Sequence, residues 1–160
     1  MVNRDHINRH AKAREYIHKG KRSSRPLSPD YEKVGLAGEA AFAERFKVEV
    51  DLTIKPGGSK GINFVINGYK INVMTARKAN YLLVEPGKVK ADVYVLAAYN
   101  DLTKDAYLMG WATKEEIEAA SISDIGGFGI KSHAIYHTRL SDIDELDVFL
   151  GLREWQPTLF

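Results

Sequence analysis

Apolar and polar residues alternate in two short runs near the middle of the chain, and this pattern predicts a β-hairpin. The runs cover residues 62–66 and 69–75, and both are rich in the β-branched and aromatic side chains that favour strands. Between them, Asn67 and Gly68 favour a two-residue type I′ turn, because both residues tolerate the positive φ angles that this turn requires. The turn sets the register of the strands, and the register decides which side chains share a face.

Counting outward from the turn places Asn63 opposite Asn72. Side chains alternate along a strand, so Lys70 and Met74 project from the same face as Asn72. Directly opposed residues on paired strands have Cβ atoms roughly 5 Å apart. We therefore expect Asn63, Asn72 and Met74 to form one group of neighbouring side chains on one face of the hairpin.

Apolar residues recur at helical spacing before the hairpin and predict a helix over residues 29–46. Ser28 is the expected N-cap, with proline at the first helical position. Glu39 borders the apolar stripe of this helix. Its small neighbours, Gly38 and Ala40, allow the helix to approach a sheet closely.

The remaining apolar runs predict further strands and two further helices. We expect strands over residues 48–54, 82–84, 91–99 and 106–111, and helices opening at capping boxes formed by Thr113 with Glu116 and by Ser141 with Asp144. This order indicates an α/β fold with a mixed sheet flanked by helices. With 160 residues and 44% hydrophobic content, the chain has room for one domain, which we place at residues 28–160.

The net charge of +2 conceals an uneven distribution. Residues 1–25 contain eight Lys or Arg residues against two acids, a charge of +6, and the rest of the chain carries −4. We interpret residues 1–27 as a basic arm and linker. Such an arm favours a polyanionic partner, because neutralising phosphates releases counterions. A flexible, solvated tail is the alternative interpretation.

The absence of cysteine excludes disulfides and thiolate zinc sites and agrees with a reducing cytoplasm. The sequence has no apolar run long enough for a membrane span, and its basic start lacks the apolar stretch of a signal peptide. We therefore expect a cytoplasmic protein of a bacterium or phage-infected host, with no membrane partner.

Two histidine pairs have the spacing of a helical metal site, His6 with His10 and His133 with His137. The first pair lies in the basic arm with no third ligand nearby. The second lies in a segment that reads as a strand, where residues four apart are too distant to chelate closely. We expect ordinary surface or phosphate-contacting histidines at these positions.

A resemblance to a known family covers about half of the chain, residues 34–119. The segments GLAGEAAFAERF, IKPGG, INFVINGYKINVMTARK, YLLVEPGKVKADVYVLAAYN and LMGWATKEEI resemble phage and bacterial proteins of the PD-(D/E)XK nuclease superfamily. The resemblance implies a restriction-endonuclease-like αβββαβ core. It places the two acids of the family motif at Asn63 and Asn72, the lysine at Met74 and a helical glutamate at Glu39. In this family, carboxylates from adjacent strands hold Mg²⁺ or Mn²⁺, and the lysine orients water or stabilises the transition state.

Only Glu39 matches the family in residue type. An amide keeps the shape of a carboxylate without its charge, and losing a unit charge about 4 Å from a divalent ion costs on the order of several kcal/mol. Met74 can neither carry charge nor donate a hydrogen bond. The candidate metal ligands Glu39, Asn63 and Asn72 are therefore expected to bind Mg²⁺ or Mn²⁺ weakly or not at all. Asp92 and Glu85 are the nearest acidic residues in sequence.

These observations lead to three hypotheses about function. The first is a DNA-binding protein with an endonuclease-like fold that does not cleave, acting alone, as a homodimer or with an active nuclease partner. The second is an active Mg²⁺-dependent DNA endonuclease with relocated ligands, or an inactivated form of one. The third is a phage protein-interaction module. The expected DNA contacts are Lys60, Lys70, Arg77 and Lys78 around the hairpin, and Arg14, Lys21 and Arg22 in the arm.

Overall fold

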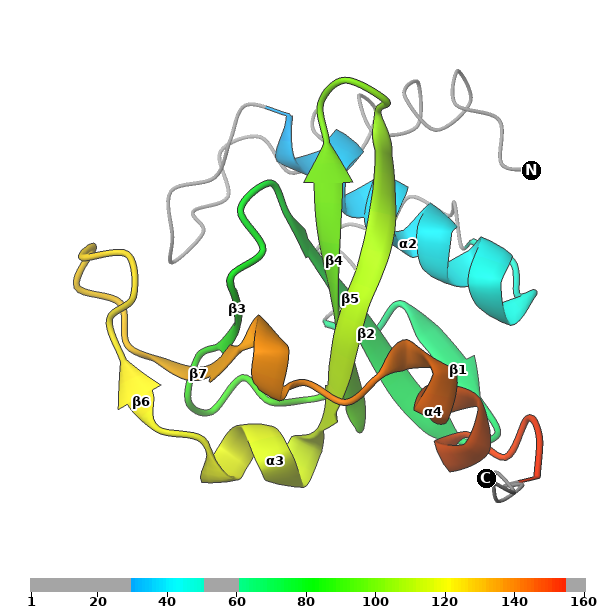
Figure 1. The fold of residues 1–160 in the computed structure, drawn as a ribbon. Coiled ribbons are helices and arrows are strands. Elements are labelled where there is room, and N and C mark those ends of the chain that lie inside the picture. The colour runs from blue at the N-terminus through cyan, green and yellow to red at the C-terminus, as the bar shows by residue number, and fades with distance from the viewer. Residues whose placement is uncertain (1–29, 51–60, 155–160) are drawn as a thin grey trace, which may run out of the picture.

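The structure is a computed structural model that describes residues 30–50 and 61–154 (Figure 1). Among the described residues the first element is a long helix and the last is a short one, and the strands lie between them. In chain order the elements are α2 (Tyr31–Phe46), β1 (Phe64–Ile66), β2 (Tyr69–Ala76), β3 (Tyr81–Val84), β4 (Val93–Asn100), β5 (Asp105–Thr113), α3 (Lys114–Ala119), β6 (Ile122–Ser123), β7 (Ser132–Tyr136), the 3₁₀ helix η1 (His137–Arg139) and α4 (Ile143–Phe149).

The strands form two sheets. The larger sheet has the order β1-β2-β4-β5, in which β2 and β4 are parallel and the other neighbours are antiparallel. The smaller sheet, β3-β7-β6, is antiparallel throughout. The predicted α/β class with a mixed sheet is confirmed. The connection from β2 to β4 contains β3, and no helix lies in this described stretch of chain.

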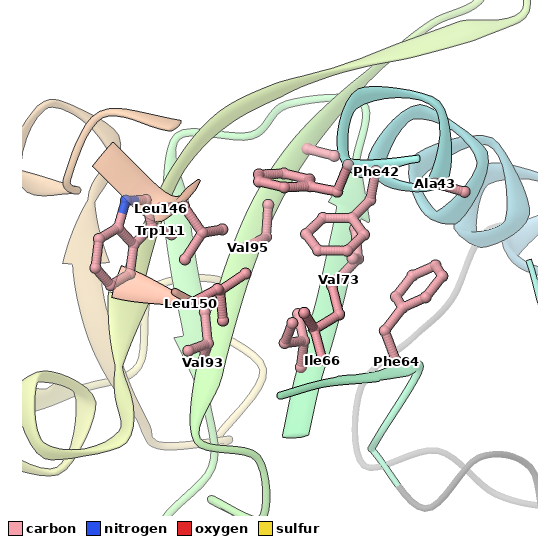
Figure 2. Close-up of a cluster of buried hydrophobic side chains, with 13 residues drawn as sticks. Phe42, Ala43, Phe64, Ile66, Val73, Val93, Val95, Trp111, Leu146 and Leu150 are labelled. Carbon is pink, nitrogen blue, oxygen red and sulfur yellow. The ribbon is translucent and has the colours of Figure 1, made fainter. Parts of the chain in front are cut away.

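Strand β4 is buried on both faces and separates two hydrophobic cores. The first core lies against α2 and α4, and Figure 2 shows most of its side chains. It contains Phe42, Ala43, Phe46, Phe64, Ile66, Ile71, Val73, Val93, Val95, Ala97, Trp111, Leu146 and Leu150. The second core contains Ala79, Leu82, Val84, Ala91, Tyr94, Leu96, Ala98, Ala112 and Ile117. Because side chains alternate along a strand, β4 contributes residues to both cores.

A β-bulge in β5 determines which of its side chains point into each core. Leu96 of β4 faces Gly110, and Ala97 faces Leu108, so Met109 is an extra residue in β5. Because the extra residue shifts the alternation, Trp111 points into the first core. The indole Nε1 of Trp111 donates to the backbone carbonyl of Asp142 at 2.8 Å.

Helix α2 approaches the larger sheet closely at Gly38, as the small residues beside Glu39 predicted. A Cβ added at Gly38 would overlap the side chain of Thr75 on β2 and would lie 2.9 Å from its Cβ. The helix begins at Tyr31, two residues after the predicted start. Asp30 occupies the N-cap position, whereas the predicted cap, Ser28, lies outside the described residues.

The structure confirms one of the predicted helix caps and corrects another. Thr113 and Glu116 form the expected capping box at the start of α3. At α4 the N-cap is Asp142, whose carboxylate accepts the N–H of Asp144 at 2.9 Å. Ser141 was expected in that role, but its backbone forms a bridge to Trp111.

The strand expected after α2 is absent from the part of its range that is described. Residues 48–50 have no strand pairing, and residues 51–54 lie outside the described ranges. Val48 and Val50 pack against the first core. Their β-branched side chains therefore reflect burial and not strand pairing.

We expect Gly38→Ala to destabilise the fold by about 1–3 kcal/mol, because the added methyl overlaps Thr75 in a close-packed contact. The cost should fall when Thr75→Ala is already present, since the overlapping hydroxyl and methyl are then absent. Urea unfolding of the two single variants and the double variant measures this coupling.

Gly35→Ala is the matched control, because it lies in the same helix and a Cβ there would have no neighbour within 4 Å. Its effect should be stabilising by roughly 0.5–1 kcal/mol, the ordinary gain for alanine over glycine in a helix. Equal effects of Gly35→Ala and Gly38→Ala would contradict the close contact with Thr75.

Candidate functional site

The hairpin has the register that the sequence predicted. Strands β1 and β2 are antiparallel, with Ile66 opposite Tyr69. Asn67 and Gly68 have φ angles of 49° and 84°, as a type I′ turn requires. The side-chain Nδ2 of Asn67 donates to the backbone carbonyl of Leu150 at 2.8 Å, which fastens the turn to the end of α4.

Asn63 lies just before β1 and continues the pairing with β2. Its backbone N–H donates to the carbonyl of Ile71 at 2.8 Å, and its side-chain Oδ1 accepts the N–H of Val73 at 2.7 Å. These bonds bracket Asn72, so Asn63 lies opposite Asn72 as predicted. Both asparagines are half-buried. The amide oxygen of Asn63 therefore completes the hydrogen bonding of a strand backbone, a role that requires no ligand.

Met74 shares its face of β2 with Asn72 and is paired with Leu96 of β4. It is half-buried and packs against the second core. A thioether suits this apolar setting, whereas an ammonium group there would lose solvation. The position that the family resemblance assigns to lysine thus contributes apolar packing in this chain.

Glu39 is buried in α2, with 7% of its surface exposed. Helix α2 covers the face of the sheet to which Ile71 and Val73 point, because these residues pack in the first core with the side chains of α2. Asn72 and Met74 point to the opposite face. Helix α2 and the side chains of Asn72 and Met74 therefore lie on opposite faces of the sheet.

Of the two acids nearest to the hairpin in sequence, Asp92 reaches it. Its Oδ2 accepts the backbone N–H of Lys70 at 2.8 Å, and its own N–H donates to the carbonyl of Lys70 at 2.8 Å. Glu85 forms an ion pair with Lys88 at 3.3 Å. Asp92 therefore anchors the start of β2 and brings one carboxylate to the end of the strand that carries Asn72.

Arg77, an expected DNA contact, is occupied by two carboxylates. Its guanidinium donates to both oxygens of Asp30, at 3.1 and 2.7 Å, and to both oxygens of Asp101, at 2.8 and 3.0 Å. It also lies over the ring of Tyr99, 5.3 Å from the ring centroid. The hydrogen bond from Arg77 lowers the pKa of Asp101. Two carboxylates neutralise this guanidinium, so it has little charge to offer a phosphate.

The other expected DNA contacts divide into two groups. Lys70 and Lys78 are exposed and have no ion pair among the described residues. The other four, Lys60 and the arm residues Arg14, Lys21 and Arg22, lie outside the ranges that the structure describes.

His133 and His137 do not form a metal site of their own. His133 is buried on β7, and its Nδ1 lies 3.0 Å from the carbonyl oxygen of Ala120. His137 begins the following 3₁₀ helix, and its ring makes a tilted contact with the ring of Tyr136. The expectation of a surface histidine is therefore wrong for His133. His6 and His10 lie outside the described residues.

The described residues contain neither a metal-binding cluster nor a membrane-spanning helix. No three His, Cys, Asp or Glu side chains there gather closely enough to hold a metal ion. None of the helices there combines the length and apolarity that a membrane span needs.

Sequence reasoning missed two groups of residues that long-range pairing creates. The first is the pair of carboxylates on Arg77, which lie 47 and 24 residues away in the chain. The second is an aromatic cluster in which Tyr81 of β3 meets Tyr136 of β7. Tyrosine at a strand end is a weak signal by itself. It gains meaning only once β3 is known to pair with β7.

Comparisons of the chain with protein-family models, with curated proteins and with solved structures find no significant match.

We expect Arg77→Gln to lower the Tm near neutral pH, because it removes the charged partner of Asp30 and Asp101. The lowered pKa of Asp101 sets the pH dependence. Its contribution to stability is complete above the ordinary value of 3.8 and is lost as the pH falls through the lower folded-state value. Thermal unfolding across this range should show the wild-type advantage at neutral pH and a smaller one in acid.

Lys131→Gln serves as the control, since Lys131 is exposed and forms no side-chain hydrogen bond or ion pair with any described residue. A difference between wild type and Arg77→Gln that does not change with pH would contradict the role of the carboxylates.

Proposed function

We propose that this protein binds DNA through a nuclease-like structural frame that no longer cleaves DNA. The frame consists of the β1–β2 hairpin together with helix α2. The observation that carries the proposal is the state of the three positions that the resemblance assigns to the catalytic acids and lysine. All three side chains are uncharged, and two of them have structural partners within the fold: Asn63 bonds the backbone of Val73, and Met74 packs against the second core.

The hairpin supports the family assignment more strongly than the wider topology does. Its register sets Asn63 opposite Asn72, with Met74 on the same face, and this is the order in which the family motif requires its acids and lysine. The connection between β2 and β4 contains β3, whereas the αβββαβ core has a helix between its last two strands. The proposal therefore rests on the hairpin.

Charge supports DNA as the partner. Residues 1–25 carry +6, Lys70 is exposed on β2, and Lys78 is exposed just after that strand. Basic groups on an arm and around a hairpin suit a phosphate backbone, because each neutralised phosphate releases a counterion. The neutral asparagines also remove the repulsion that carboxylates without a metal ion would exert on phosphate.

A second candidate is a nuclease with relocated metal ligands, and the position of Asp92 favours it. Its carboxylate touches the backbone of Lys70, two residues before Asn72 on β2. One oxygen of that carboxylate is engaged by the Lys70 N–H, so a metal would have to share the group with the strand backbone. Mg²⁺-dependent cutting by the unaltered chain, abolished by Asp92→Asn, would favour this candidate over the first.

The main experiment restores the motif with Asn63→Asp, Asn72→Asp and Met74→Lys in one chain. We expect the variant to bind Mn²⁺ in calorimetry and to cut duplex DNA, whereas the unaltered chain does neither. Adding Glu39→Gln to the restored chain should reduce cutting, which tests the helical glutamate separately. A restored variant that folds but neither binds metal nor cuts would show that the family assignment is wrong.

DNA binding is tested by fluorescence anisotropy of a labelled duplex at several salt concentrations. Deleting residues 1–25 should weaken binding and flatten the dependence on salt, by roughly 0.9 in the logarithmic slope for each phosphate that the arm neutralises. Lys70→Gln should weaken binding in the same assay, and Lys104→Gln is its control. Absence of binding at low salt would refute the proposal and favour a protein-interaction module.

A further inference from the structure

An aromatic cluster lies where the smaller sheet ends. Tyr81 opens β3 and Tyr136 closes β7, and the two residues are directly paired. Their ring centroids are 5.1 Å apart at an interplanar angle of 87°. The centroid of the His137 ring lies 4.6 Å from that of Tyr136, and the two rings are tilted by 32°.

The backbone holds this cluster in place. The N–H of His137 donates to the carbonyl of Asn80 at 2.8 Å, which extends the pairing of the two strands past their last residues. The 3₁₀ helix η1 then closes with a bond from the Leu140 N–H to the His137 carbonyl at 3.3 Å. Because the rings are positioned before any ligand arrives, binding would cost them little conformational freedom.

The cluster is accessible, and basic residues flank it in the sequence. Tyr136 is 41% exposed. Lys78 and Arg139, one on each side of the paired tyrosines in sequence, are exposed and make no ion pair within the described part of the chain. Residues 78–81 and 136–139 contain no acid. The cluster thus combines π-faces with cations that have no carboxylate partner among the described residues.

Structural packing explains only part of this arrangement. A cross-strand tyrosine pair stabilises an antiparallel sheet, and the edge-to-face contact of Tyr81 with Tyr136 is typical of such pairs. That role does not require Tyr136 to remain exposed or the adjacent cations to lack acidic partners. Exposed aromatic rings together with cations are the elements with which proteins bind nucleic-acid bases and phosphates.

We propose that Tyr81, Tyr136 and His137, with Lys78 and Arg139, form a binding platform for single-stranded DNA. Bases in a duplex are stacked on one another and cannot offer their faces to a protein ring, whereas an unpaired strand can. One or two bases stack on Tyr136 and its neighbours, and the adjoining phosphates contact the cations. The choice of DNA as the polymer rests on the proposed function, and Lys78 is common to both proposals, but the paired tyrosines lie on the smaller sheet and not on the hairpin.

The test uses the full-length chain with a labelled oligothymidylate and, in parallel, a labelled duplex. Tyr136→Leu keeps an apolar side chain but removes the ring, and it should weaken single-strand binding about tenfold. Tyr136→Phe keeps the ring and should bind as the unaltered chain does. An oligonucleotide containing 2-aminopurine should lose fluorescence on binding, and Tyr136→Leu should diminish that loss, because the quenching reports stacking.

Tyr107→Leu is the matched control. Tyr107 is a more exposed tyrosine, at 61%, and it lies on β5 of the larger sheet. This variant should leave single-strand binding unchanged. Arg139→Gln should make the salt dependence of single-strand binding shallower by roughly 0.7 in the logarithmic slope, the value for one phosphate contact. Circular dichroism of each variant verifies that the fold is intact.

The outcomes separate this inference from the proposed function. Single-strand binding that Tyr136→Leu leaves intact would overturn the platform, as would duplex binding without single-strand binding, and the proposed function would survive both results. Equal weakening of duplex and single-strand binding by Tyr136→Leu would overturn the specificity for unpaired bases. Failure of the unaltered chain to bind either form at low salt would refute both proposals.

Discussion

The burial of β4 on both of its faces is the constraint on which the rest of the fold depends. A strand covered on both sides requires an apolar layer on each side of the sheet. Helices α2 and α4 supply one layer, and the smaller sheet with α3 supplies the other (Figure 1). The bulge at Met109 belongs to the same requirement, because without it Trp111 would leave the first core.

The same constraint decides the surroundings of the hairpin residues. Since β2 lies beside β4, its alternating side chains are divided between the two cores, and Met74 falls on the side of the second core. The structure thus accommodates an apolar residue at the position that the resemblance assigns to a lysine. Asn63 is held by a hydrogen bond from the backbone of the neighbouring strand. The hairpin therefore needs no charged side chain at these two positions to keep its shape.

Local rules were sufficient for those features that depend on nearby residues. The turn at Asn67 and Gly68 fixed the register, the capping box at Thr113 fixed the start of α3, and a continuous apolar run identified β4. Pairings between distant segments were not predictable in this way. The N-cap of α4 is Asp142 and not the predicted Ser141, because the backbone of Ser141 is engaged by the distant β5.

The candidate site likewise has features that the sequence predicts and features that it does not. Its arrangement on the hairpin followed from register alone. The electrostatics did not, because Arg77 meets its two carboxylates only after α2 and the β4–β5 turn have come together around it. The basic character of a segment in sequence is therefore a poor measure of the charge that it presents once folded.

The hydrogen bond from Asn67 to Leu150 joins two segments that are synthesised at different times. The hairpin is a local structure whose partners are a few residues apart, and such structures form early. Its turn is fastened by a residue 83 positions further along the chain. During synthesis the hairpin emerges long before α4 exists, so its turn stays unfastened until nearly the whole domain has been made. Helix α4, the last helix among the described residues, thus completes the support of the segment that carries the candidate site.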